Sequence, residues 1–324
     1  MTVGPSDGSG SEDRVGGLVA VHAHPDDETL ATGALLATFA RAGAPVTVVT
    51  ATRGERGEVI GDALAHLEGD GPALAAHRET ELAAALGALG VHDHTFLDRL
   101  PPADGRRYED SGMVWAGAAR AALGSDVPVR AFVGVPLEEA AERLAGLLRR
   151  RRPAVVATYD PEGGYGHPDH VRTHEVTMRA VALAAGAGWS PVVLWRRAGR
   201  HAQAAAAAAL ATHGPWPEGL TVTGPGDEPA ALVVVDAAVT VRVDARAVAE
   251  PLLEALRAHR TQVQAVTPLS DARALGAFAL SNGRVQPVLP DEGYEVAAGD
   301  VSAVRWPDGV RSDGAQDPQS APVA

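Results

Sequence analysis

Apolar residues along the chain form short runs that alternate with longer stretches of helical spacing. The short runs are rich in Val and Ala and are typical of strands buried on both faces, whereas the longer stretches repeat apolar residues every three or four positions. The predicted strands are residues 17–22, 45–51, 94–97 and 154–159, and the predicted helices are residues 29–41, 73–89 and 137–150. Strands separated by helices predict βαβ units, and therefore an α/β fold: a Rossmann-like parallel sheet covered by helices on both faces.

The pattern is less regular in the last third of the chain. An Ala-rich stretch over residues 202–211 predicts a helix, and residues 232–243 predict one or two strands. Residues 245–259 have helical spacing, and Pro251 either interrupts that helix or lies in its first turn.

These patterns suggest a division into four parts. We expect a Rossmann-like core over residues 16–195 and a smaller C-terminal portion, residues 196–306, that packs on it. Residues 1–15 and 307–324 are rich in Gly, Ser, Asp and Pro, and this composition predicts disordered tails.

Charge and composition exclude several classes of protein. Asp and Glu outnumber basic residues by 41 to 28, for a formal net charge of -13, and the chain has no Lys. Nucleic-acid binding depends on clustered positive charge, so we expect no nucleic-acid partner. The chain has no Cys, so a transition metal would have to be held by carboxylates and by its 12 His. The N-terminus lacks the features of a signal peptide and no apolar run could cross a bilayer, so we expect a cytoplasmic protein with no membrane partner.

A polar segment, HAHPDDE (residues 22–28), follows the first predicted strand directly. The carboxyl ends of parallel strands are where α/β proteins bind ligands, so this segment is suitably placed for a site. Adjacent carboxylates beside a His favour a divalent cation as their charge partner. The alternative is an acidic turn that caps the next helix, but a cap does not explain His24.

A second polar segment, DPEGGYGHPDH (residues 160–170), follows the fourth predicted strand. Pro168 suits the first position of a helix, which would place His167 and His170 on the same side of the helix start. The alternative is a pair of surface His side chains satisfied by water. Because both segments follow strands of one sheet at its carboxyl edge, we favour a shared metal site.

A set of two His and one carboxylate leaves positions open for water, which is typical of a catalytic zinc site. Such a metal polarises a carbonyl and lowers the pKa of bound water, so hydrolysis is the expected chemistry. A second carboxylate that does not bind the metal must accept the proton of the water. Asp26 and Asp27 provide one residue for each role.

These motifs resemble the PIG-L/LmbE-like family of zinc-dependent N-deacetylases, whose fold is Rossmann-like. Further segments resemble the branch of that family that deacetylates N-acetyl-glucosaminyl-inositol in mycothiol biosynthesis. The segments are HPDDE (24–28), TRGERGEVIG (52–61), DSGM (110–113), TYDPEGGYGHPDH (158–170) and HRTQ (259–262). The resemblance covers roughly residues 16–195 and 245–300.

The resemblance implies that His24, Asp27 and His170 bind one Zn²⁺ per chain, with Fe²⁺ as the alternative metal. It also implies that Asp26 is the general base. Asp169, beside His170, is expected to support a ligand without binding the metal itself.

The remaining implied residues act on the substrate. Tyr165 would stabilise the oxyanion, and His167 the charge that develops in the transition state. Arg78 and Asp110 match residues that hold sugar hydroxyls in the family, and Glu58 matches a further residue of that pocket. From spacing alone, Arg78 could equally be an exposed helical residue paired with a neighbouring Glu, and Asp110 a plain turn residue.

The resemblance therefore implies a zinc-dependent amidohydrolase whose partner is a small-molecule N-acetylated aminosugar, with N-acetyl-glucosaminyl-inositol as the expected substrate. Two alternatives in the family are a mycothiol S-conjugate amidase and a deacetylase of another aminosugar. The amidase pattern has a Lys after the acidic motif and a Pro before HPDH, whereas this chain has no Lys and has Gly166, which favours the deacetylase. A rival from another class is a non-catalytic Rossmann-like module that binds a sugar or nucleotide, but no G-x-G-x-x-G follows the first strand.

Overall fold

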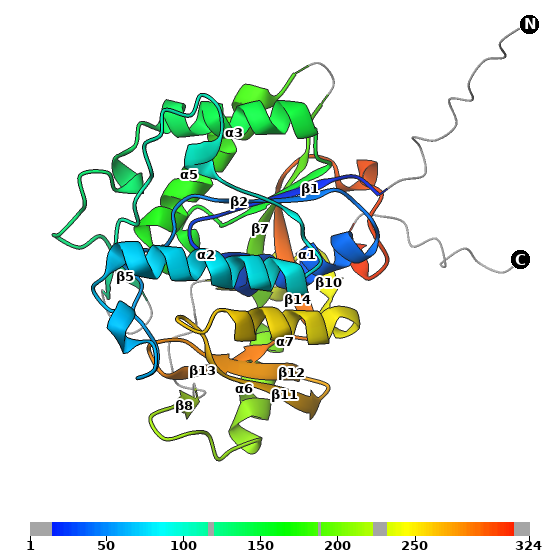
Figure 1. Cartoon of the computed structure of the whole chain (residues 1–324). Helices are drawn as coiled ribbons and strands as arrows, with labels where there is room; N and C mark the ends of the chain where they lie inside the picture. Colours follow the sequence, from blue (N-terminus) through cyan, green and yellow to red (C-terminus); the bar gives the residue numbers. More distant parts are fainter. Residues whose placement is uncertain (1–14, 116–119, 187–188, 223–231, 314–324) are drawn as a thin grey trace, which may run out of the picture.

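The computed structural model describes residues 15–115, 120–186, 189–222 and 232–313 (Figure 1). Within these residues the central sheet has nine strands. They are β1 (Leu18–His22), β2 (Val46–Thr50), β3 (Asp93–Phe96), β6 (Val155–Thr158), β7 (Val192–Gly199), β9 (Val233–Val234), β10 (Val241–Asp244), β14 (Asp291–Ala298) and β15 (Val310–Ser312). Their order is β15-β10-β14-β7-β6-β1-β2-β3, with β9 paired to β7. The strands from β7 to β3 are parallel, and β14, β10 and β15 continue the sheet in antiparallel fashion.

Helices cover both faces of this sheet. They are α1 (Asp27–Arg41), α2 (Gly71–Ala88), α3 (Leu137–Arg151), α4 (Gly163–Gly166), α5 (Pro168–Ala184), α6 (Arg200–Thr212) and α7 (Ala249–Ala258). Alternate residues of β1 point to opposite faces: Leu18 and Ala20 join the apolar cluster under α1, α2 and α7, whereas Val19 and Val21 join the cluster under α3 and α5. The predicted α/β fold, with a parallel sheet covered on both faces, is confirmed.

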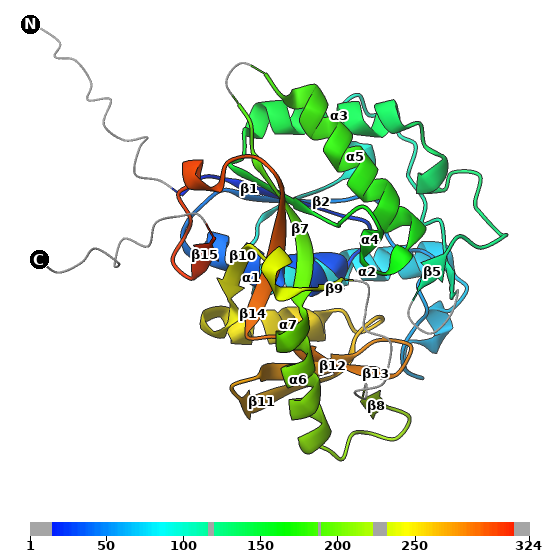
Figure 2. The same ribbon diagram turned by 180° about the vertical axis from the view of Figure 1, so that it is seen from behind.

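A smaller sheet and a hairpin complete the described structure. The smaller sheet has the order β11-β12-β13-β8, and β4 pairs with β5 in the hairpin. The bounds are β4 (Val114–Trp115), β5 (Ala121–Ala122), β8 (Thr221–Val222), β11 (Gln264–Asp271), β12 (Ala274–Ala279) and β13 (Arg284–Val288). Apolar residues of α6 pack on the smaller sheet, which lies below the central sheet in Figure 2. No helix in the described part of the chain is long and apolar enough to cross a membrane.

The C-terminal third differs from the expectation in two ways. The predicted boundary after residue 195 falls inside β7, and β10, β14 and β15 extend the central sheet, so this part of the chain continues the core in addition to packing on it. Residues 310–312, predicted to belong to a disordered tail, form the edge strand β15 because their backbone groups pair with β10. Residues 307–309 and 313 of that predicted tail are also described, whereas residues 314–324 and residues 1–14 lie outside the described residues. Pro251 lies in the first turn of α7, where its missing N–H leaves no helical bond unmade.

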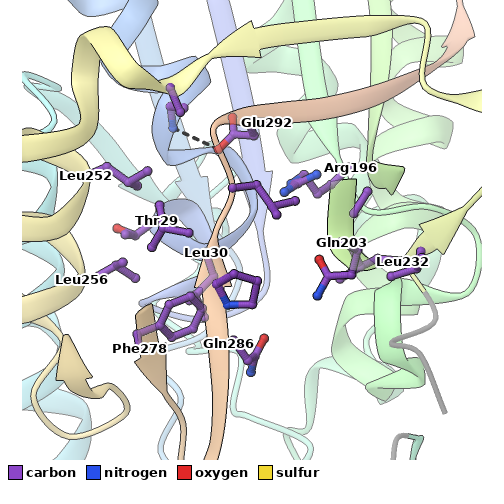
Figure 3. Close-up of a pocket in the computed structure, with 17 residues that line it drawn as sticks. Thr29, Leu30, Arg196, Gln203, Leu232, Leu252, Leu256, Phe278, Gln286 and Glu292 are labelled. Carbon is purple, nitrogen blue, oxygen red and sulfur yellow. Dashed lines mark hydrogen bonds between the residues drawn. The ribbon is translucent and has the colours of Figure 1, made fainter. Parts of the chain in front are cut away.

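Helix α1 is kinked at Thr32, whose backbone is not helical (φ -137°, ψ 15°). Beyond the kink, the backbone N–H groups of Ala34 and Leu35 donate to the Glu292 carboxylate of β14, at 3.0 and 2.8 Å. Figure 3 shows Glu292 in this position, beside a cavity lined mainly by apolar side chains such as Leu252. The kink therefore separates the first turn of α1, which carries the acidic motif, from the rest of the helix.

Candidate active site

Two loops at the carboxyl ends of adjacent parallel strands bring the predicted metal ligands together. Strand β1 leads into His24 and then into α1, whose first residue is Asp27, and its neighbour β6 leads through α4 to His170 in the first turn of α5. The three side chains are buried. As expected, Pro168 occupies the first turn of α5 and the rings of His167 and His170 lie side by side, with centroids 4.9 Å apart.

The hydrogen bonds of the two His ligands assign their lone pairs. The Nε2 atom of His24 lies 3.2 Å from Oδ2 of Asp169, which places a proton on Nε2. Burial opposes the charged ring, but the carboxylates of Asp110, Asp169 and Asp27 raise the pKa of His24 well above its usual value, so a metal ion would have to displace a proton from Nδ1 to use its lone pair. In His170 the Nδ1 atom lies 3.2 Å from the carbonyl oxygen of Gly163, which places the lone pair on Nε2. His24 Nδ1 and His170 Nε2 each lie 3.3 Å from Oδ2 of Asp27. Once Nδ1 of His24 has lost its proton, two lone pairs and a carboxylate oxygen therefore face one another.

This donor set fits a divalent metal ion. The buried Nε2 atom of His170 has no hydrogen-bond partner among the described residues. Neutral imidazole nitrogens and a carboxylate oxygen are ligands that Zn²⁺ and Fe²⁺ accept. Two other groups have potential ligand atoms that all lie within 4.8 Å of one another: His24 with His167 and His170, and His24 with Asp110 and Asp169. Asp27 joins the site through its separate contacts with His24 and His170.

His167 differs from the other two His in its hydrogen bonding. Its Nδ1 atom accepts the backbone N–H of Asp169 at 3.1 Å, so the proton of the neutral ring belongs on Nε2. Burial, together with the nearby rings of His24 and His170, lowers the pKa of His167 well below its usual value. Neutral His167 therefore offers an N–H donor toward the cluster and is less suited than His24 or His170 to bind a metal.

Asp26 lies beside the ligands and is also buried. Burial raises the pKa of its carboxyl to about 6, against the opposing effect of the Arg78 guanidinium, whose Nη2 atom lies 3.4 Å from Oδ1 of Asp26. Arg78 also donates to the carbonyl oxygens of Pro25 and, at 2.8 Å, of Gly54. A carboxylate that titrates near neutral pH beside a metal site is suited to accept and return a proton.

Tyr165 lies in α4, with its ring centroid 5.1 Å from that of His170 and 6.0 Å from that of His167. Burial, followed by the charges of Asp27 and Asp26, raises the pKa of its phenol well above the usual value. The hydroxyl therefore keeps its proton and can donate a hydrogen bond.

The three expected sugar-binding residues have different surroundings. Arg78 is 2% exposed and contacts Asp26 and backbone carbonyls, so it is not the exposed helical Arg that spacing alone allowed. Asp110 is buried, accepts from the backbone N–H groups of Gly112 (2.8 Å) and Arg56 (3.2 Å), and faces the cluster. The structure does not bring Glu58 into the cluster, because its side chain is exposed.

Three further buried residues support the cluster and were not singled out from the sequence. The ring of Tyr159 stacks on that of His170, with centroids 4.2 Å apart, and its hydroxyl accepts the backbone N–H of Ala23 at 2.9 Å. Glu28 and His259 form a fully buried pair, with Nε2 of His259 2.7 Å from Oε1 of Glu28. Burial opposes ionisation of Glu28, but His259 and the hydrogen bonds to the carboxylate lower its pKa to about 2. Their signal in the sequence was their presence in the TYDPEGGYGHPDH, HPDDE and HRTQ segments.

Comparison with known proteins connects these residues to a family. The model of the PIG-L family, described as GlcNAc-PI de-N-acetylase, matches residues 19–181. A protein of Kineococcus radiotolerans named 1D-myo-inositol 2-acetamido-2-deoxy-alpha-D-glucopyranoside deacetylase is 47% identical over 301 residues, which cover 87% of this chain and 77% of that protein. A protein of the same name from Rhodococcus erythropolis is 42% identical over 296 residues, covering 89% of this chain and 92% of the relative.

Among solved structures, the N,N'-diacetylchitobiose deacetylase of Pyrococcus horikoshii resembles the chain. Its TM-score is 0.45 at 22% identity, and the match covers 76% of this chain and 70% of that structure.

Proposed function

The chain belongs to the PIG-L family of de-N-acetylases, and from this premise we propose that it removes acetate from an N-acetylated aminosugar linked to inositol. The reaction class is hydrolytic deacetylation, as the family description states. The substrate is inferred from relatives 40–47% identical to this chain that are named as deacetylases of 1D-myo-inositol 2-acetamido-2-deoxy-alpha-D-glucopyranoside. That compound is N-acetyl-glucosaminyl-inositol, the precursor expected in mycothiol biosynthesis.

One observation carries the proposal: the lone pairs of His24 and His170 and the Oδ2 atom of Asp27 converge, with the buried carboxyl of Asp26 beside them. We assign His24, Asp27 and His170 as ligands of one divalent metal, zinc or ferrous iron. Bound there, the metal would act as a Lewis acid toward the acetamide carbonyl and would acidify a water molecule. Asp169 supports this set by accepting the Nε2 proton of His24.

The other side chains perform the proton transfers and stabilise charge. Asp26 accepts a proton from the water as its oxygen attacks the acetamide carbon, and the carbonyl oxygen becomes an oxyanion. The hydroxyl of Tyr165 and the Nε2–H of neutral His167 are donors on the side of the cluster that carries α4, and we assign them to this oxyanion. Asp26 then gives its proton to the nitrogen as the carbon–nitrogen bond breaks, which yields acetate and the free amine.

We place substrate recognition on the loops around the cluster. Asp110 is the strongest candidate for a sugar hydroxyl because it is buried and faces the cluster, and exposed Glu58 would contact the sugar only at the rim. Arg78 is more suited to holding Asp26, since its guanidinium is already engaged by two backbone carbonyls.

Acetate release from N-acetyl-glucosaminyl-inositol tests the function. We expect the zinc- or iron-loaded protein to release acetate and the Asp26→Asn variant to bind the metal but lose most of the rate. A mycothiol S-conjugate and N-acetylglucosamine serve as competing substrates. Faster cleavage of the conjugate would replace the deacetylase with the amidase, and a metal-loaded protein inactive on all three substrates would contradict the proposed chemistry.

A further inference from the structure

The backbone of Asp26 adopts a conformation that is rare outside glycine. Its φ is 112° and its ψ is -35°. Holding a non-glycine residue in such a region costs on the order of 1–3 kcal/mol, so neighbouring groups must stabilise it. The conformation matters because it sets the direction of the carboxyl that we assign as the general base.

Two side chains hold the peptide unit between Pro25 and Asp26 from its two ends. The Nη2 atom of Arg78 donates to the carbonyl oxygen of Pro25. The Oε2 atom of Glu28 accepts the N–H of Asp26 at 2.9 Å. Because both polar groups of the peptide are engaged, its plane has little freedom to rotate.

The Glu28 carboxylate is in turn held by a residue from a distant part of the chain. Glu28 and His259 are both 0% exposed, and His259 Nε2 lies 2.7 Å from Glu28 Oε1. The hydroxyl of Thr29 donates to the same oxygen at 2.6 Å. His259 is thus the charge partner of a buried carboxylate that water cannot reach, and removal of such a partner is costly.

The backbone that carries His259 is itself firmly placed. His259 ends α7, and its carbonyl oxygen accepts the backbone N–H groups of Gln262 (3.0 Å) and Val263 (2.8 Å). In the same turn, Thr261 donates through its backbone N–H (2.8 Å) and its hydroxyl (2.6 Å) to the buried carboxylate of Glu81 in α2. The turn after α7 is therefore anchored to the core independently of Glu28.

We propose that His259 and Glu28 are a positioning pair for the general base: His259 fixes the Glu28 carboxylate, which fixes the Asp26 peptide and so the aim of the Asp26 carboxyl. In this arrangement both residues act on the general base through the Asp26 peptide, with His259 bonded to Glu28 and Glu28 bonded to the Asp26 N–H. The inference rests on the proposed function for its kinetic consequence, but its structural consequence, the φ of Asp26, does not depend on the reaction.

Substitution of His259 by two amides of different length tests the pair. The amide of His259→Gln reaches the position of Nε2, whereas that of His259→Asn reaches only the position of Nδ1. We expect His259→Asn to lower kcat by about 10-fold to 100-fold, the range for a misaligned reacting group, and His259→Gln to recover most of the loss. KM and the zinc dissociation constant, measured by competition with a chelator, should stay within about threefold of wild type, because Asp27 and the sugar contacts are untouched.

Two further variants and a structural measurement keep the test decisive. His259→Leu, which has no side-chain donor, replaces His259→Asn if that variant does not fold. His94→Leu, at a partly buried His on β3, controls for loss of an imidazole elsewhere. A crystal structure of wild type should show Asp26 at its positive φ. A crystal structure of His259→Asn or His259→Leu should show that Asp26 has left it.

The outcomes distinguish the proposed positioning pair from the proposed deacetylase function. Unchanged kcat and unchanged φ in a folded His259→Asn or His259→Leu variant would overturn the positioning pair, as would a parallel loss of zinc affinity, which would place the effect on Asp27. If wild type releases no acetate, the proposed function fails, and the φ of Asp26 still decides the structural inference.

Discussion

The Nε2 atom of His170 lies 3.3 Å from the Oδ2 atom of Asp27, and when the neutral ring donates from Nδ1 to the carbonyl oxygen of Gly163, its lone pair faces that carboxylate oxygen. A lone pair and a carboxylate oxygen at this distance repel each other unless a cation lies between them. The pair links the first turn of α1 to the first turn of α5, so the cation would also join two segments of the fold.

Removing the metal should therefore lower both the metal content and the thermal stability of the protein. We expect about one zinc or iron per chain by elemental analysis, and a lower Tm after chelation, since a bound ion at 100 times its dissociation constant stabilises by about 2.7 kcal/mol. His170→Ala should lose the ion and show no further fall in Tm with chelator, whereas Asp26→Asn should behave like wild type. Equal metal loss in both variants would contradict the division of roles between Asp26 and Asp27.

Tyr165→Phe should lower kcat with little change in KM. We assign the protonated phenol as an oxyanion donor, and loss of one such donor costs about 100-fold to 1000-fold in kcat. Steady-state kinetics of acetate release measure the effect. An increase in KM alone would instead place Tyr165 in ground-state substrate binding.

Arg78→Lys should damage deacetylation of every acetylated sugar alike. A single ammonium group cannot reproduce the guanidinium that contacts Asp26, Pro25 and Gly54, so we expect kcat/KM to fall by about 10-fold to 100-fold on both the inositol-linked sugar and simple N-acetylglucosamine. A loss confined to the inositol-linked sugar would support the sugar-binding role that the family resemblance implies.

Glu292→Ala should destabilise the fold by about 2–4 kcal/mol, because the N–H groups of Ala34 and Leu35 lose a buried acceptor. Denaturant unfolding measures the change. Glu295→Ala is a matched control on the same strand, since Glu295 forms a partly exposed ion pair with Arg197 and should cost at most about 1 kcal/mol. Equal losses in the two variants would show that Glu292 does not support the kink of α1.

His94 should make stability depend on pH. Burial, reinforced by Arg99 and Arg53, lowers its pKa from 6.5 to about 4. Between these values the unfolded chain binds the proton and the folded chain does not, so this contribution to stability is complete above pH 6.5 and is lost as the pH falls toward 4. Between pH 7 and pH 5, wild type should therefore lose more unfolding free energy than His94→Gln. Parallel curves for the two proteins would contradict the lowered pKa.

Most of the parallel core could be predicted from the sequence. Strands β1, β2, β3 and β6 and helices α1, α2 and α3 follow local patterns, in which the strand runs are short and apolar and the helices are amphipathic. The short hairpin strands β4 and β5 were not predicted. The two polar segments could also be brought together in advance, because the carboxyl ends of parallel strands lie at one edge of a sheet.

The C-terminal strands could not be assigned in the same way. In β11 and β13 many residues are half-buried or exposed, so their sequences lack the apolar runs of the core strands. The edge strand β15 has a tail-like composition, and its order depends on backbone pairing with β10, which no local pattern reveals.

At the site, the sequence by itself determined which chemical groups meet: two His, two Asp and a Tyr at the ends of neighbouring strands, in motifs that identify a deacetylase family. Only the tertiary structure decided which nitrogen of each His has a partner outside the cluster, because it places Asp169 beside Nε2 of His24 and the carbonyl oxygen of Gly163 beside Nδ1 of His170. Likewise, only the tertiary structure shows that His259 contacts Glu28 and that Arg78 contacts Asp26. Such contacts join residues far apart in the chain, and their energies depend on burial, which exists only once the sheet and its helices have packed.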